Sequence, residues 1–396
     1  MIEILNEKQK QGLEIAIQRY NQGYKYTTIA GYAGTGKSFL TKVIVQALGL
    51  NPEEDVCFAT FTGKAAQVLI DRGNKNCMTL HKLLYKAKPL PNGKFKYDHV
   101  EFIPYKVIIV DEVSMAPKSL LDDLFMYGCH VIMLGDPYQL PPIRKDDVHD
   151  YLQHPHIFLD EIMRQEAESG IITLSMLIRE GKPYRNFTTE NAITLPKRDL
   201  TTGMLEWADI VLCATNNERM AINNTIRALT GKTGYIDEGD KLINLHNQWD
   251  TLSDKENPLT NGVIGYMTDI YESFVSIPAR IGVQGNQIPT IVGHFISETG
   301  EDFGVLEIDK KCLITGEPLL TPQQQYKMRK DKVLKDMMPL TMTYGSCITT
   351  HKAQGSEWDK VLVIEEGFPY VKEEHSRWLY TACTRAANRL VVIEKF

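Results

Sequence analysis

One stretch of the sequence decides the fold of this chain: Gly31-Tyr-Ala-Gly-Thr-Gly-Lys-Ser38. It matches the phosphate-binding pattern G-x-x-x-x-G-K-[ST] at every fixed position. The β-prone run Tyr26–Ala30 precedes it, and the amphipathic run Phe39–Leu50 follows it. A strand, a glycine turn and a helix are the setting in which backbone N–H groups and a helix N-terminus hold phosphate. The stretch therefore predicts a nucleoside triphosphate site.

The residue types of this loop explain how it would hold a nucleotide. Its glycines, including Gly31, let the backbone curl so that N–H groups point at phosphate oxygens. Lys37 is expected to reach the β- and γ-phosphates, and Ser38 to ligate Mg²⁺. The expected nucleotide contacts are Gly34, Thr35, Gly36, Lys37 and Ser38. The alternative, a turn with a chance Gly-Lys-Ser, leaves the matching strand and helix unexplained.

Length and composition place the chain among soluble globular proteins. Its 396 residues allow two or three domains, and 43% are hydrophobic and 24% charged. The sequence has no apolar run long enough to span a bilayer and no signal sequence, so we expect no membrane partner. Seven scattered cysteines without a C-x-x-C pair favour reduced thiols over disulfides or zinc. A net charge of −6 neither supports nor excludes nucleic-acid binding.

Strand-like apolar runs alternate with helical patterns, which predicts an α/β fold. Val107–Val110 is an uninterrupted β-branched run, typical of a strand buried on both faces of a parallel sheet. Similar runs occur at Val56–Thr60, Val131–Leu134, Ile210–Ala214, Lys360–Ile364 and Leu390–Ile393. Sheets of this kind place their sites at the carboxyl ends of the strands.

Changes in pattern divide the chain into domains. The predicted parts are a first α/β domain (1–85 and 107–158), a hairpin insertion (86–106), a second α/β domain (159–240 and 341–396) and a β-rich insertion (241–340). Pro91-Asn-Gly-Lys94 supplies the turn of the hairpin. Frequent Gly, Pro and Asn predict short strands and turns in the β-rich insertion. Gln323–Lys335 is its exception, a polar and basic helix.

Polar residues follow two of the buried strands where a phosphate site is expected. Asp111 and Glu112 close the run Val107–Val110. Asp111 would hold Mg²⁺ through water, and Glu112 would polarise the attacking water. Gln139 lies just past the next strand, where its amide can bond both the γ-phosphate and that water. Taken alone, the two carboxylates are also compatible with an acidic turn, and residues 135–142 with a proline-rich loop.

Seven motifs, in order along residues 5 to 386, resemble those of superfamily 1 helicases of the RecD/Dda-like subfamily. They are Leu5-Asn-x-x-Gln9, Gly31–Ser38, Asp111-Glu-Val-Ser-Met115, Gly135-Asp-Pro-Tyr-Gln-Leu-Pro-Pro142, Leu159-Asp-Glu-Ile-Met-Arg-Gln165, Thr350-His-Lys-Ala-Gln-Gly-Ser-Glu357 and Tyr380-Thr-Ala-Cys-Thr-Arg-Ala386. In length and layout the chain is most similar to the small Dda-type helicases of bacteriophages.

The resemblance implies two RecA-like, parallel-sheet P-loop NTPase domains, with a hairpin (pin) insertion in the first and an SH3-like β insertion in the second. It implies an ATP-dependent DNA helicase that translocates 5′ to 3′ on single-stranded DNA and unwinds duplex, with ATP and Mg²⁺ as cofactors. Expected partners are single-stranded DNA, single-strand/duplex junctions, and replication or recombination proteins. We expect a monomer in the cytoplasm of a bacterial or phage-infected cell.

Two other interpretations stay open at this point. One is a DNA-dependent ATPase motor that translocates or displaces proteins without efficient unwinding, or serves as the motor subunit of a recombination or repair complex. The other is an ATP-binding switch or loader without directional movement. The presence of Glu112 and of the arginines described next argues against the switch.

Carried over position by position, the resemblance adds residues to the nucleotide site. Gln9 would read the adenine edge. Arg164 and Arg385 would act as arginine fingers on the γ-phosphate, a role that suits planar guanidinium groups in a closing cleft. Gly355 would approach the γ-phosphate side, and Glu357 the ribose. A single arginine such as Arg164 is also compatible with a surface salt bridge.

The resemblance also implies a path for DNA. The expected DNA-binding residues are Thr60, Thr62, Lys64, Thr79, His81, Thr350, His351 and Lys352. Hydroxyls, N–H groups and lysines hold phosphates without reading sequence. Phe95 and Phe102, in the hairpin insertion, are candidates for the wedge that separates the strands. Each aromatic is also compatible with core packing, and His81 with an ordinary packed histidine.

Overall fold

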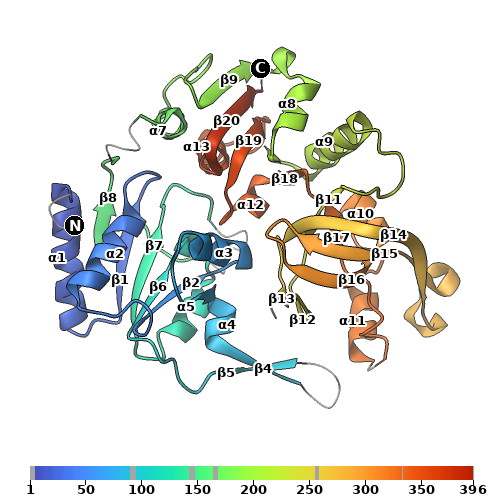
Figure 1. The fold of residues 1–396 in the computed structure, drawn as a ribbon, viewed down its shortest axis with the longest axis horizontal. Coiled ribbons are helices and arrows are strands. Elements are labelled where there is room, and N and C mark those ends of the chain that lie inside the picture. The colour runs from blue at the N-terminus through green and yellow to red at the C-terminus, as the bar shows by residue number, and fades with distance from the viewer. Residues whose placement is uncertain are drawn as a thin grey trace. The chain divides into compact units, whose positions relative to one another are not determined.

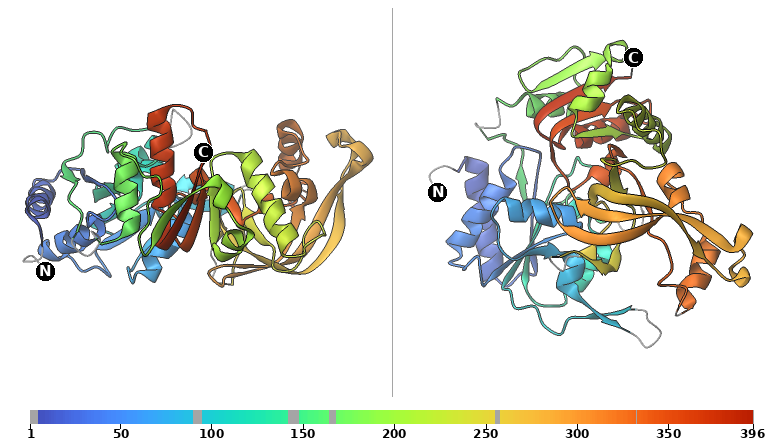
Figure 2. Two further views of the ribbon diagram at one scale, coloured as in Figure 1. Left: turned by 90° about the horizontal axis from the view of Figure 1, so that it is seen from above. Right: turned by 45° about the vertical axis from the view of Figure 1, so that its right-hand side comes forward.

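The structure is a computed structural model that describes residues 5–89, 95–141, 148–163, 168–254, 258–331 and 333–395. The chain forms two compact units, the first from residues 1–88, 96–200 and 353–396 and the second from residues 89–95 and 201–352. Figures 1 and 2 show the helices and strands of both units. None of the described helices is long and apolar enough to cross a membrane. All seven cysteines are free thiols.

The first unit contains a six-stranded parallel sheet, which confirms the predicted α/β fold. Its strand order is β3 (Cys77–Thr79), β2 (Val56–Thr60), β6 (Val107–Val110), β7 (His130–Gly135), β1 (Tyr26–Gly31) and β8 (Ile157–Leu159). Every neighbouring pair is parallel. The helices along this part of the chain are α1 (Glu7–Asn21), α2 (Lys37–Ala47), α3 (Gly63–Asp71), α4 (Leu80–Leu84), η2 (Val113–Met115) and α5 (Lys118–Leu124).

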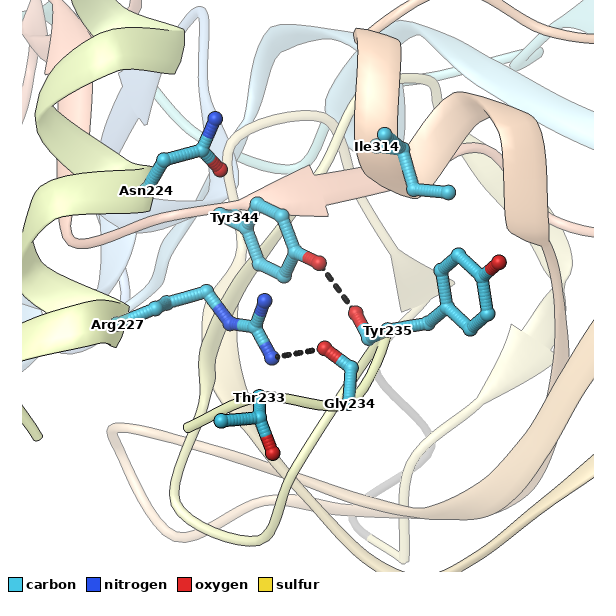
Figure 3. A pocket seen from close by; sticks show the side chains of 7 residues that line it. All are labelled: Asn224, Arg227, Thr233, Gly234, Tyr235, Ile314 and Tyr344. Atoms are coloured by element: carbon cyan, nitrogen blue, oxygen red, sulfur yellow. Dashed lines mark hydrogen bonds between the residues drawn. The ribbon is translucent and has the colours of Figure 1, made fainter. Parts of the chain in front are cut away.

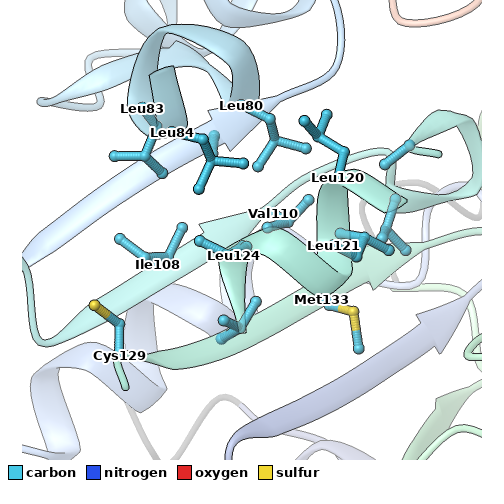
Figure 4. Packing of buried hydrophobic residues seen from close by; sticks show 14 of the residues in the cluster. Leu80, Leu83, Leu84, Ile108, Val110, Leu120, Leu121, Leu124, Cys129 and Met133 are labelled. Carbon is cyan, nitrogen blue, oxygen red and sulfur yellow. The ribbon is translucent and has the colours of Figure 1, made fainter. Parts of the chain in front are cut away.

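Both faces of this sheet are covered. Ile108 and Val110 of β6 belong to one buried cluster, and Val107 and Ile109 to another. Because successive side chains of a strand point to opposite faces, a fully apolar strand needs a core on each side. Figure 4 shows the first cluster, in which these leucines of α4 and α5 pack on β6: Leu80, Leu83, Leu84, Leu120, Leu121 and Leu124.

The first unit continues with elements from later in the chain. They are α7 (Gly170–Arg179), β9 (Ala192–Pro196), η4 (Lys197–Asp199), β19 (Trp358–Ile364), α13 (Lys372–Cys383) and β20 (Ala386–Glu394). Strands β19, β20 and β9 pair in parallel in that order. The sequence patterns do not predict β9, which is short and ends in proline. A two-stranded hairpin, β4 (Tyr85–Pro89) and β5 (Phe95–His99), confirms the insertion, while the predicted turn 91–94 lies outside the described residues.

The second unit contains an antiparallel sheet, which confirms the β-rich prediction. Its strand order is β16 (Asp302–Asp309), β15 (Gln287–Ser297), β14 (Ile264–Ser276), β11 (Lys241–Asn244) and β17 (Met342–Tyr344). Beside it β12 (Gln248–Leu252) pairs with β13 (Pro258–Leu259). The remaining elements are α8 (Thr202–Trp207), β10 (Ile210–Cys213), α9 (Asn216–Leu229), η5 (Ala279–Ile281), η6 (Gln284–Asn286), α10 (Lys310–Thr315), α11 (Pro322–Lys330), β18 (Cys347–Thr349) and α12 (Thr350–Ala353).

Two details predicted for residues 241–340 are wrong. Strands β14 and β15 have 13 and 11 residues and are not short. Gly265, which reads as a turn residue, lies inside β14, where a Cβ would come within 2.3 Å of the carbonyl oxygen of Ile296.

The helix predicted at Gln323–Lys335 is shorter in the structure. Helix α11 stops at Lys330, because the side chain of Asp331 accepts N–H groups just beyond it, including that of Val333.

The predicted second α/β domain, 159–240 and 341–396, is divided between the two units. Strands β10 and β18 of that range form a parallel pair in the second unit, whereas β9, β19 and β20 lie in the first. The domain boundaries and the SH3-like character of the insertion stay predictions.

Candidate nucleotide site and DNA-binding residues

The predicted phosphate-binding loop connects β1 to α2, as the motif requires. Gly36 takes a φ of 79°, and a Cβ there would lie 2.4 Å from the sulfur of Met163. Only glycine satisfies both conditions. The ammonium of Lys37 donates to the carbonyl oxygens of Gly31 at 2.8 Å and Tyr32 at 2.9 Å. In this structure the cation is held by its own loop.

The other predicted residues of the loop lie beside Lys37. Gly34 has a φ of 74°, and its carbonyl oxygen accepts the N–H of Met163 at 2.9 Å. The hydroxyl of Thr35 is buried and donates to Tyr32 O at 2.8 Å. Ser38 is exposed on the first turn of α2. The structure therefore gathers the predicted loop residues at one strand–helix junction.

Two adjacent carboxylates follow β6, as predicted. Asp111 Oδ1 accepts the N–H of Glu112 at 2.9 Å, and Glu112 takes a φ of 51°. Burial, followed by the charge of Glu112, raises the pKa of Asp111 to about 6. The described residues contain no group of three or more His, Cys, Asp or Glu that would hold a metal alone. Ser38 and Asp111 suit Mg²⁺, which commonly takes one or two protein oxygens and completes its shell with phosphates and water.

Gln139 connects Glu112 to Arg385. In the amide orientation that satisfies both neighbours, its nitrogen donates to Glu112 Oε2 at 2.9 Å and its oxygen accepts from Arg385 Nη2 at 3.1 Å. Arg385 Nη1 also lies 3.7 Å from Glu112 Oε1, and the arginine is 3% exposed. The structure thus brings three of the predicted catalytic residues together. In it, the polar groups of these three side chains are the partners of one another.

Helix α13 holds the segment that carries Gln139. The hydroxyl of Tyr138 donates to Ser376 at 3.0 Å, and the N–H of Leu140 donates to Thr381 Oγ1 at 3.1 Å. The carbonyl oxygen of Leu140 accepts from Gln354 Nε2 at 2.7 Å. These contacts fix the loop after β7 to elements from the end of the chain.

Three of the remaining predicted nucleotide residues, Gln9, Glu357 and Gly355, make other contacts in this structure. Gln9 is 1% exposed, and both its amide atoms are used: Oε1 accepts the Asn6 N–H, and Nε2 donates to Thr35 O. Glu357 forms an ion pair with Arg72. A Cβ on Gly355 would lie 3.1 Å from Thr62 Oγ1, so this glycine permits close packing on α3. Arg164 lies outside the described residues.

The motifs give no role to two residues that touch the phosphate-binding loop. The guanidinium of Arg179 stacks on Tyr32 at 3.6 Å from the ring centroid. The hydroxyl of Tyr380 bonds the N–H of Ala33. Neither contact could be found from spacing, because each joins the loop to a helix distant in sequence. Tyr380 does lie inside a quoted motif, which is the one signal the sequence offers.

Known proteins match this chain along most of its length. Family models match an AAA domain at residues 4–194 and a UvrD-like helicase C-terminal domain at residues 344–393. The ATP-dependent RecD2 DNA helicase of Deinococcus radiodurans is 35% identical over 380 residues, 93% of this chain and 46% of that protein. The ATP-dependent DNA helicase Dda of Enterobacteria phage T4 is 30% identical over 192 residues, 45% of this chain and 43% of that protein.

A solved structure has the same fold. The Pif1 helicase from Bacteroides, in complex with ADP-AlF3 and single-stranded DNA, aligns with a TM-score of 0.50 and 17% identity over 98% of this chain and 92% of that one. The chain is similar to superfamily 1 helicases of the RecD and Dda type. Its mixed α/β fold is consistent with the two RecA-like domains of that family. It spans less than half the length of the two curated relatives.

The threonines predicted to bind DNA in the first unit make local hydrogen bonds. Thr60 is 1% exposed and donates to Thr62 O at 2.8 Å. The hydroxyl of Thr62 caps α3, and that of Thr79 caps α4 by accepting the Lys82 N–H at 3.2 Å. A hydroxyl that accepts such a bond still has its own proton to donate. The two half-buried capping threonines therefore keep a donor for a phosphate.

The other residues predicted to contact DNA in the first unit are partly covered. The ammonium of Lys64 is buried over the indole of Trp358, 3.9 Å from the ring centroid. His81 is half-buried, and burial lowers its pKa. Phe102 is 73% exposed, so the core-packing alternative is wrong for it. The side chain of Phe95 lies outside the described part of the chain.

The second unit carries the three remaining predicted DNA residues at the start of α12. Thr350 is fully buried and donates to Cys213 O at 3.4 Å. Burial lowers the pKa of His351. Burial, followed by the charge of Arg219, lowers the pKa of Lys352 to about 8. Lys352 therefore carries a charge at neutral pH and loses it in mild alkali.

Figure 3 shows a pocket of about 410 Å³ in the second unit. It is lined by Asn224, Arg227, Thr233, Gly234, Tyr235, Ile314 and Tyr344. Arg227 pairs with Asp237 and Asp240 at 3.0 Å each and donates to Gly234 O. Because two carboxylates neutralise the guanidinium, the pocket offers no charge to an anion. It contains none of the predicted site residues.

Proposed function

We propose that this chain is an ATP-driven motor that translocates 5′ to 3′ on single-stranded DNA and unwinds duplex ahead of it. One observation carries the proposal: Glu112, Gln139 and Arg385 form a single cluster in the unit that holds the phosphate-binding loop. A carboxylate that can polarise water, an amide that contacts it and an arginine are the groups that γ-phosphate hydrolysis requires. The RecD2 and Dda relatives are both ATP-dependent DNA helicases, which supports the same conclusion.

Hydrolysis would require the hydrogen bonds of this structure to be exchanged. Lys37 would leave the carbonyl oxygens of Gly31 and Tyr32 for the β- and γ-phosphates, whose charge is the stronger acceptor. Arg385 would leave Glu112 for the γ-phosphate oxygens, and Glu112 would then be able to polarise water. Ser38 and Asp111 would hold Mg²⁺, which neutralises developing phosphate charge.

The predicted DNA-binding residues support single-stranded DNA as the track. Hydroxyls on Thr62 and Thr79 and the cation of Lys352 suit phosphates and read no sequence. The Bacteroides Pif1 structure was solved with single-stranded DNA, which is consistent with this assignment. We also propose junction DNA as substrate, with replication or recombination proteins as partners in a bacterial or phage-infected cytoplasm. Since Arg385 and Lys37 share one chain, a monomer would be a complete ATPase.

The test uses two partial duplexes, one with a 5′ single-stranded tail and one with a 3′ tail. We expect DNA-stimulated ATP turnover with both and strand release only from the 5′-tailed duplex. Release from the 3′-tailed duplex alone would contradict the polarity. Turnover without release from either would favour a motor that translocates or displaces proteins. Specific activity that falls on dilution would contradict the monomer.

A further inference from the structure

Tyr380 lies at a junction between the two parts of the nucleotide site. It is on α13 and is 1% exposed. Its hydroxyl donates to Asp136 Oδ2 at 2.5 Å and accepts the backbone N–H of Ala33 at 3.0 Å. Ala33 belongs to the phosphate-binding loop, and Asp136 begins the segment that carries Gln139. One hydroxyl therefore connects the loop to that segment.

The polar atoms at this junction depend on one another. Asp136 is 1% exposed, and its second oxygen, Oδ1, accepts the N–H of Tyr138 at 2.9 Å. A buried N–H or carboxylate oxygen that loses its partner has no bulk water to replace it. The Tyr380 hydroxyl thus satisfies Oδ2 of the buried Asp136 and also accepts the N–H of the half-buried Ala33.

The other contacts of α13 with this segment do not extend to the phosphate-binding loop. Ser376 bonds Tyr138, and Thr381 bonds Leu140. Among the described residues, only the hydrogen bond of Tyr380 also joins α13 to the loop. Tyr138 packs edge-on against Tyr380, with ring centroids 5.3 Å apart, so the aromatic surroundings hold the ring without help from its hydroxyl.

We propose that Tyr380 is a positioning residue for ATP hydrolysis, whose hydroxyl sets the place of Gln139 relative to the phosphate-binding loop. The inference rests on the proposed function. Gln139 contacts both Glu112 and Arg385, so a shift of the segment moves the amide relative to the γ-phosphate and the attacking water. Ground-state binding of the nucleotide depends on Lys37 and on the loop residues 34–38, whereas the hydroxyl contacts the loop at Ala33.

The first test is Tyr380→Phe in the full chain, with Tyr184→Phe as the matched control. Tyr184→Phe also removes a partly buried tyrosine hydroxyl that donates to a carboxylate, that of Glu365, which belongs to neither the phosphate-binding loop nor the segment that carries Gln139. For Tyr380→Phe we expect DNA-stimulated kcat to fall about 10- to 100-fold, as for misplacement of a reacting group by a fraction of an ångström to 1 Å. The KM for ATP and the affinity for a fluorescent ADP stay within about threefold, since ground-state binding is retained. Tyr184→Phe keeps kcat near that of the wild type.

The second test asks whether Tyr380 acts through Asp136. Asp136→Asn changes the carboxylate that accepts the Tyr380 hydroxyl, and it keeps an oxygen that can accept the Tyr138 N–H. We expect it to lower kcat in the same selective way, and the double variant to be no slower than the slower single variant. If Tyr380→Phe fails to fold, Asp136→Asn alone still decides whether the junction affects kcat.

Three outcomes would overturn the role of Tyr380 alone: wild-type kcat in Tyr380→Phe, equal losses of kcat and ADP affinity, or strictly additive effects in the double variant. A wild-type chain that binds ADP but hydrolyses no ATP would overturn the proposed function, and this inference with it. The wild-type assay in the same series separates the two cases.

Discussion

The predicted nucleotide site and the threonines predicted to bind DNA in the first unit differ in where their hydrogen bonds go. Glu112 and Arg385 meet across most of the length of the chain, with Gln139 between them. Thr62 and Thr79, in contrast, bond N–H groups three residues further along their own helices. The first set is held by tertiary structure and can exchange partners. The second set is part of secondary structure.

This difference decides what a substitution does. Loss of a group from the nucleotide cluster removes charge or geometry needed in the transition state and leaves the fold largely intact. Loss of a capping hydroxyl weakens a helix whether or not DNA is bound. The predictions below test this contrast at each site in turn.

Lys37→Ala should have the largest effect. The variant loses the cation that would neutralise the β- and γ-phosphates, so we expect ATP turnover to fall by at least about 10³-fold. Single-stranded DNA affinity without nucleotide should stay at the wild-type value, because Lys37 bonds only its own loop here. Turnover by a coupled assay and DNA binding by fluorescence anisotropy measure both quantities. Retained turnover would refute the nucleotide site.

The contrast also explains which parts of the site the sequence could predict. The phosphate-binding loop is local, so spacing alone places Lys37 and Ser38 on the first turn of α2. The family motifs then predict that Gln139 and Arg385 belong to the site. They do not predict that the side chain of Gln9 accepts the N–H of Asn6 at the start of its own helix. Nor do they predict that Glu357 forms an ion pair with Arg72.

In the fold, likewise, the buried parallel strands could be predicted from apolar runs, because both faces of such strands are covered. The length of β14 could not. Gly265 lies inside that strand because a neighbouring backbone approaches it closely, and the sequence does not reveal this contact. Local pattern therefore predicts elements well and predicts contacts between elements poorly.

Gln139→Ala should have the next largest effect. Its amide bonds Glu112 and Arg385, so removing it leaves those two to pair directly without the group that contacts the attacking water. We expect kcat to fall about 10- to 100-fold, because a positioned hydrogen-bonding group is lost from the transition state. Tyr184→Phe is the control and should keep wild-type kcat. Equal rates for both variants would exclude Gln139 from catalysis.

Lys352 should make DNA affinity depend on pH. Its pKa of about 8 means that it is charged at pH 7 and neutral at pH 9. We expect affinity for single-stranded DNA to fall about three- to tenfold over that range, with one fewer phosphate contact in the salt dependence. Lys352→Met should remove this pH-dependent part. An identical pH profile in wild type and variant would place Lys352 away from DNA.

The lowered pKa of Lys352 also predicts how the stability of the fold depends on pH. An unfolded lysine keeps its proton up to about pH 10.5, whereas folded Lys352 releases its proton near pH 8. Between these values the unfolded chain binds more protons, so stability should rise with pH through this window. The free energies of unfolding of the wild type and of Lys352→Met are measured in urea from pH 7 to 10. The difference between the two proteins isolates this contribution. If the stability of the wild type relative to Lys352→Met falls or stays constant as the pH rises, the burial of the ammonium is contradicted.

Thr79 should show the smallest effect and the most informative one, because its hydroxyl can cap α4 and donate to a phosphate at the same time. Thr79→Ala loses both roles, and we expect about 1 kcal/mol less stability together with weaker DNA binding. Thr79→Ser keeps both. Thr79→Asp keeps the cap, since its carboxylate accepts the Lys82 N–H, but it has no proton to donate and repels phosphate.

The aspartate variant therefore separates the two roles of this threonine. We expect its thermal stability to match the wild type while its affinity for single-stranded DNA falls below that of Thr79→Ala. Thr321→Asp is the matched control, because Thr321 caps α11 in the same way and is not predicted to contact DNA. If both aspartate variants bind DNA equally well, the hydroxyl of Thr79 acts only on its helix, and the contrast between exchangeable and structural hydrogen bonds becomes sharper still.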